Sequence, residues 1–122
     1  MQYGQLLADV RERMGGDREE AERATEATLA TLVERLTPEE AQDLIAQLPV
    51  ELKLALRPPN VAQPRSMDEF VATVAEREGV SDPGRAREHA RAVLLTLQLA
   101  VSAGEMNDIL AQLPGDYAPL VT

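Results

Sequence analysis

The stretch DLIAQLP at residues 43–49 returns as DILAQLP at residues 108–114, 65 positions further along the chain. Aligned without gaps at this spacing, residues 17–49 and 82–114 share twelve identical residues, whereas about two would be expected by chance. With a one-residue gap the match continues upstream and pairs Gly15 with Gly79. An internal duplication therefore organises the sequence.

The repeated stretch predicts the end of a helix. Leu44 and Leu48 lie one turn apart on a core-facing stripe, as do Ile109 and Leu113. The proline that follows each AQLP leucine disfavours the α-conformation for that leucine and lacks a backbone donor. We therefore expect each AQLP to place a buried leucine at a helix end and to redirect the chain.

Helix starts also recur in the sequence. A residue suited to the N-cap stands three positions before a glutamate at Asp17, Thr37, Ser66 and Ser102, and Asp82 stands before a proline. At such starts the cap oxygen can accept an orphan backbone N–H, and the later glutamate can reach back to the cap. Glycines 15 and 79 stand where the preceding helices should stop.

These signals predict an all-α fold, a helical bundle of two tandem pseudo-repeats within a single domain of residues 1–122. Each repeat has about three helices and a short terminal turn. The predicted helices are 3–14, 18–36, 38–47, 67–78, 83–101 and 103–112, with a helical turn near 50–56 and one after Pro114. Repeat one covers residues 1–56 and repeat two covers 66–122; the proline-rich segment 57–65 between them reads as a stiff, extended linker.

Composition narrows the function classes. The net charge is −9 and both repeats are acidic, so we expect no nucleic-acid partner. The chain has no cysteine, which excludes disulfides, thiolate metal sites and a cysteine nucleophile. Charged residues interrupt residues 2–13 before an apolar region as long as that of a signal peptide can form. The longest apolar stretch of the chain is too short to span a bilayer. We therefore expect a cytoplasmic protein without membrane insertion.

A family resemblance covers nearly the whole chain. LTPEEAQDLIAQLPVEL, VSAGEMNDILAQLPGDY and SMDEFVATVAEREGV together resemble the bacterial domain-of-unknown-function family 2267. The resemblance implies an all-helical fold and no established activity.

For the residues that could serve in catalysis or metal binding, the sequence favours structural roles. His89 is the only histidine and sits at the edge of an apolar stripe, so we expect a boundary residue. The carboxylates of DREEAE, PEEAQD and MDE fall in first helical turns, where negative charge complements the helix dipole, so we expect them to be solvated. No Glu-x-x-His pair, calcium loop or Gly-x-Ser-x-Gly motif occurs. The sequence predicts no catalytic residue, metal ligand or cofactor.

Several apolar residues have no assigned packing partner in the predicted fold. If exposed, these apolar residues before the linker and near the C-terminus would form an adhesive patch: Leu54, Leu56, Tyr117, Leu120 and Val121. Otherwise they would lie across the two repeats and close the core. Leu95 and Leu99 extend the apolar face of helix 83–101 and need a cover, which repeat one or a second subunit would supply.

Three functions stay open on this basis. The first is a non-catalytic protein-interaction or scaffold module that binds a protein partner or itself as a homo-oligomer. The second is a sensor for a small apolar ligand between the repeats, lined by Leu95, Leu99, Met106 and Tyr117. The third, which we rank last, is an enzyme that uses carboxylates alone.

Overall fold

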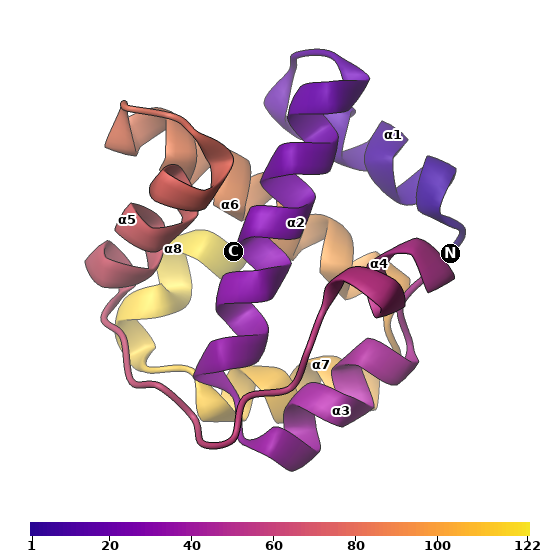
Figure 1. The fold of residues 1–122 in the computed structure, drawn as a ribbon, viewed down its shortest axis with the longest axis vertical. Helices are drawn as coiled ribbons and strands as arrows, with labels where there is room; N and C mark the ends of the chain where they lie inside the picture. Colours follow the sequence, from indigo (N-terminus) through magenta and orange to yellow (C-terminus); the bar gives the residue numbers. More distant parts are fainter.

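The chain is built of helices alone in the computed structural model, which describes all of residues 1–122 (Figure 1). The predicted all-helical class is confirmed, and the predicted helix bounds agree to within one residue. The elements are α1 (Tyr3–Met14), α2 (Arg18–Arg35), α3 (Pro38–Ala46), α4 (Val50–Ala55), α5 (Met67–Glu78), α6 (Pro83–Ala100), α7 (Ala103–Gln112), the 3-10 helix η1 (Gly115–Tyr117) and α8 (Ala118–Val121).

Side-chain caps start the helices as the sequence indicates. The carboxylate of Asp17 accepts the backbone N–H of Glu20 at 2.9 Å. Ser66 and Glu69 form a complete capping box at the start of α5. Gly79 ends α5 in the left-handed conformation with φ 77°, which a residue with a side chain adopts at a cost.

The AQLP stretches end α3 and α7. Leu44 and Ile109 are fully buried, Leu48 is buried, and Leu113 is half-buried against the core. Pro49 then precedes α4, so the chain turns where proline and its preceding leucine were predicted to turn it.

The two long helices α2 and α6 form the centre of the molecule, and both α1 and α5 pack against both of them. Helices α3 and α7 contact each other at the lower end of the molecule in Figure 1. One apolar core takes residues from every α-helix. No helix is long and apolar enough to cross a membrane.

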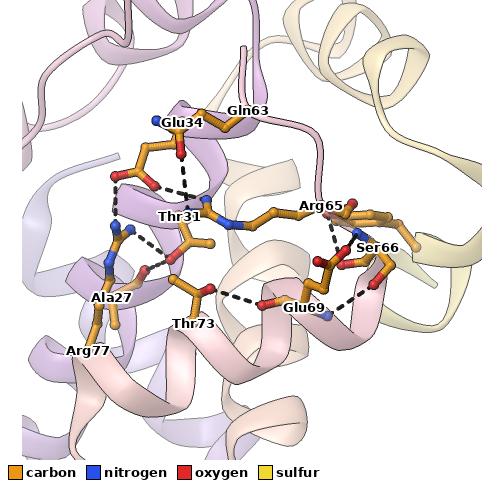
Figure 2. A network of polar contacts seen from close by, with 10 residues as sticks. Ala27, Thr31, Glu34, Gln63, Arg65, Ser66, Glu69, Thr73 and Arg77 are labelled. Atoms are coloured by element: carbon orange, nitrogen blue, oxygen red, sulfur yellow. Dashed lines mark hydrogen bonds and ion pairs between the residues drawn. The ribbon is translucent and has the colours of Figure 1, made fainter. Parts of the chain in front are cut away.

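The segment between α4 and α5 is extended and is fastened to α2 (Figure 2). The backbone N–H of Gln63 donates to the carbonyl oxygen of Glu34 at 2.8 Å. The Glu34 carboxylate accepts hydrogen bonds from Arg65 at 2.9 Å and from Arg77 at 2.7 Å. Burial raises the pKa of Glu34, but the hydrogen bonds from Arg77 and Arg65 outweigh burial and hold this pKa below its usual value.

Candidate functional site

The starts of α3 and α7 differ from the predicted capping boxes. Thr37 Oγ1 accepts the backbone N–H of Glu40 at 3.3 Å, and Ser102 Oγ accepts that of Glu105 at 3.1 Å. This half of each box is as predicted. The other half, a hydrogen bond from the N-cap backbone N–H to the glutamate side chain, was predicted wrongly, because neither glutamate reaches back to its cap.

Two glutamines from the AQLP stretches take the place of the glutamates. Gln112 Oε1 accepts the backbone N–H of Thr37 at 2.9 Å, and Gln47 Oε1 accepts that of Ser102 at 2.8 Å. The amide groups of the same glutamines donate to the cap hydroxyls, Gln112 to Thr37 at 3.1 Å and Gln47 to Ser102 at 3.4 Å. Each cap of one helix is thus completed by the end of the other helix.

Because the caps are already satisfied, Glu40 and Glu105 are free to turn inward. They are only 8% and 7% exposed, which for Glu40 corrects the expectation that the carboxylates of PEEAQD are solvated. Asp43, one turn further along α3, is exposed as expected, and Asp108 at the equivalent position of α7 is exposed as well.

Ligand oxygens of Glu40, Asp43 and Glu105 lie within 4.8 Å of one another. We call these three residues the carboxylate centre. One oxygen of Glu40 and one of Glu105 are buried without any hydrogen-bond partner. None of the ion pairs in the structure involves a residue of the centre.

The electrostatics of the centre follow from this geometry. Burial, the hydrogen bond and charge of the neighbouring Glu40 carboxyl, and the charges of Asp43 and Asp108 together raise the pKa of Glu105 to about 8. Two neighbouring carboxylates that are taken out of water disfavour each other's charged form. The arrangement is chemically suited to hold a positive charge, and its all-oxygen donor set is the one that hard metal ions prefer.

A second polar cluster involves His89. Nδ1 of His89 pairs with a carboxylate oxygen of Glu78, and both residues are 5% exposed. The predicted boundary histidine is therefore buried, with a partner at the end of the preceding helix that sequence reasoning missed. The pair borders a polar cavity of about 500 Å³. Ser81 lines the same cavity, but no hydrogen bond joins Ser81 to His89, so no nucleophile is coupled to this pair.

The seven apolar candidate residues fall into two sets. Leu56, Met106, Tyr117 and Leu120 are buried in the core. Leu54 is 76% exposed and Leu99 is 59% exposed, whereas Leu95 is half-buried and lines a cleft beside Arg91. The structure therefore does not bring together the four residues predicted to surround an apolar ligand.

A second exposed apolar residue, which was not predicted from the sequence, lies beside Leu54 on α4. Val50, one turn before Leu54 on α4, is 62% exposed and borders a cleft with Met1. Figure 1 shows α4 at the edge of the molecule, next to the N-terminus.

A comparison with models of protein families places the chain in a family. The model of a family described as "Uncharacterized conserved protein" matches residues 3–120. No curated protein matches the chain.

Proposed function

We propose that this chain, which belongs to the family of uncharacterized conserved proteins DUF2267, is a non-catalytic module that binds a positively charged ligand at the carboxylate centre. The observation that carries this proposal is the pair of buried carboxylates, Glu40 and Glu105, each with one oxygen that has no partner. Burying like charges without compensation is costly, and a buried charge is normally paired or bound to a metal. A cationic ligand would supply the missing compensation.

In this proposal the module consists of two tandem helical repeats, and the ligand lies between them. The contact of Thr37 with Gln112 has a counterpart in the contact of Ser102 with Gln47, and each pair of equivalent positions is 65 residues apart. Such reciprocal contacts are expected of an approximate two-fold axis, as at an isologous interface. The ligand would take Glu40 from repeat one and Glu105 from repeat two, and so would join the repeats.

The position of the centre favours binding over turnover. The five cavities with volumes of about 270 to 600 Å³ are all lined by other residues. A substrate with a bond to be broken needs such a cavity beside the acid or base. This supports a binding role for the carboxylate pair.

A thermal-shift titration tests the proposed function. The chelator-treated protein is titrated with positively charged probes of several kinds: calcium, magnesium and manganese chloride, spermidine, and arginine, each at matched ionic strength. We expect at least one probe to raise Tm, because a ligand that binds only the folded state stabilises it. We expect Glu105→Gln to remove that rise, while Glu39→Gln, at an exposed position on the same turn as Glu40, retains it. A wild-type Tm that no cation raises would contradict the proposal.

A second candidate is the protein-interaction role predicted from the sequence. The exposure of Leu54 and Val50, which share one face of α4, favours it. The simplest partner is a second copy of the chain. Light scattering coupled to size-exclusion chromatography should then show a dimer, and the Leu54→Glu variant should be a monomer. A wild-type protein that stays monomeric at high concentration would exclude self-association.

A further inference from the structure

We infer that the ligand of the carboxylate centre is a hard divalent cation of the calcium, magnesium and manganese class, held directly by Glu40, Glu105 and Asp43. This inference rests on the proposed function and names the class of ligand at the same site.

The spacing of the oxygens suits a single ion. Carboxylate oxygens bind these cations at about 2.0 to 2.6 Å, so two oxygens around one ion lie at most about 5 Å apart. The ligand atoms of the three residues lie within 4.8 Å of one another. One ion placed between oxygens this close is shared by all three residues once the side chains draw in slightly.

The buried oxygens give a second, independent reason. Glu40 and Glu105 are more than nine-tenths buried, and an oxygen of each has neither a protein donor nor water access. Most buried polar atoms in proteins have a partner, so an unpartnered pair at one place indicates a missing partner. Metal coordination satisfies such oxygens and compensates their charge together.

The surroundings of the centre do not suit an organic cation. The five cavities of about 270 to 600 Å³ lie elsewhere, and none of them offers an ammonium or guanidinium compound a position beside the centre. Aromatic rings, which commonly enclose such ligands, are scarce in this chain. Phe70 and Tyr117 pack edge to face against each other within the core, and Tyr3 belongs to the cleft beside α4.

The donor atoms select the class of metal. All of them are carboxylate oxygens, the chain has no cysteine, and its only histidine is paired with Glu78. Oxygen-only sites suit calcium, magnesium and manganese, whereas zinc and copper prefer sites with nitrogen or sulfur. Asp43 is exposed, so it opens the site to solvent, and water can complete the coordination on that side.

Calorimetry on the 122-residue chain, freed of metal by a chelator, tests the inference. We expect calcium, magnesium or manganese chloride to bind with a stoichiometry of one. We expect Glu40→Gln and Glu105→Gln each to weaken the affinity at least tenfold, and Asp43→Asn to weaken it less. Glutamine keeps the side-chain volume and removes charge, so these variants are expected to fold. Glu39→Gln is the matched control and should bind as the wild type does.

The other outcomes distinguish a failure of the metal assignment from a failure of the proposed function. No heat and no Tm rise with the three metal chlorides would overturn the inference. If spermidine or arginine instead raises Tm in a manner that depends on Glu105, the proposed function stands and the metal assignment is wrong. If no cation has an effect, both fail. If a metal binds equally well to the Glu40→Gln and Glu105→Gln variants, the ion lies elsewhere and the inference is wrong.

Discussion

The side-chain oxygen of Gln112 lies 2.9 Å from the backbone nitrogen of Thr37 and accepts its hydrogen bond. In a capping box this N–H would be bound by the glutamate three residues into the helix. The exchange of a local partner for one 75 positions away has two effects: it joins the end of α7 to the start of α3, and it releases Glu40 to the interior.

The first prediction concerns this contact. Gln112→Ala removes the hydrogen bond to the Thr37 N–H and the bond from its own amide to the Thr37 hydroxyl. We expect the free energy of unfolding to fall by about 1 to 2 kcal/mol, the range for one or two partly exposed hydrogen bonds. Urea denaturation measures the change. Gln42→Ala, at an exposed position on α3, is the control and should change stability by less than about 0.5 kcal/mol.

The second prediction compares Leu44, in the first AQLP helix, with Leu54 on α4. Leu44→Ala should lower the free energy of unfolding by about 2 to 5 kcal/mol, because the side chain is fully buried and its removal leaves a cavity. Leu54→Ala should change it by less than about 0.5 kcal/mol, because that side chain is mostly exposed. Equal losses for the two variants in the same denaturation experiment would contradict the burial described here.

The sequence predicts the elements of this fold well because their signals are local. Caps, proline and glycine act within one turn of the residues that they affect, so the helix bounds follow from short stretches. The buried state of Glu40 and Glu105 does not follow from such stretches. It depends on the contact between α3 and α7 and on glutamines that take over the caps from a distance.

One signal for the carboxylate centre was nevertheless present in the sequence. Among the identities at a spacing of 65 are Glu40 with Glu105 and Asp43 with Asp108, so an E-x-x-D pattern recurs at equivalent helix starts. A solvated helix start accepts many different residues. The presence of the same glutamate and the same aspartate at both helix starts therefore indicates a requirement that the two starts share. The pairing of His89 with Glu78 had no comparable signal, because it depends on how α5 and α6 pack.

The third prediction uses the lowered pKa of Asp9. Hydrogen bonds from Arg13 and Thr96 hold the pKa of Asp9 below its usual 3.8. A carboxyl group whose pKa is lower in the folded state binds fewer protons there, so its contribution is present above the unfolded pKa and is lost as the pH falls through the folded pKa. Asp9→Asn should therefore lower the free energy of unfolding by about 1 kcal/mol at pH 7. Denaturation at several pH values should show the difference from the wild type shrinking below pH 3.8, and a constant difference would contradict the assignment.

The fourth prediction concerns the charge of the carboxylate centre without metal. In a chelator at pH 7, Glu105→Gln should raise the free energy of unfolding by about 1 to 2 kcal/mol, because a carboxyl group whose pKa is raised to about 8 must take up a proton on folding, whereas glutamine is neutral in both states. The new amide can also donate to the unpartnered oxygen of Glu40. Asp116→Asn, which removes an acidic group that caps the N–H of Met67, should instead lower stability. A loss of stability in Glu105→Gln would show that the carboxylate pair is not in electrostatic conflict.

The last prediction concerns the extended segment between α4 and α5. Trypsin cleaves after arginine only when the side chain can enter its binding pocket, and Arg65 is engaged by Glu34 while its carbonyl oxygen accepts the Tyr117 hydroxyl at 2.8 Å. Glu34→Ala frees the Arg65 guanidinium and removes its ion pair, so the segment should open locally more often. We expect cleavage after Arg65 to become several-fold faster, measured by mass spectrometry of timed digests. Arg57 precedes a proline, which resists trypsin, so it should contribute little to the digest. Glu39→Ala, which removes an exposed carboxylate with no ion pair, is the control, and an equal acceleration in that variant would mean that Glu34 does not hold the segment in place.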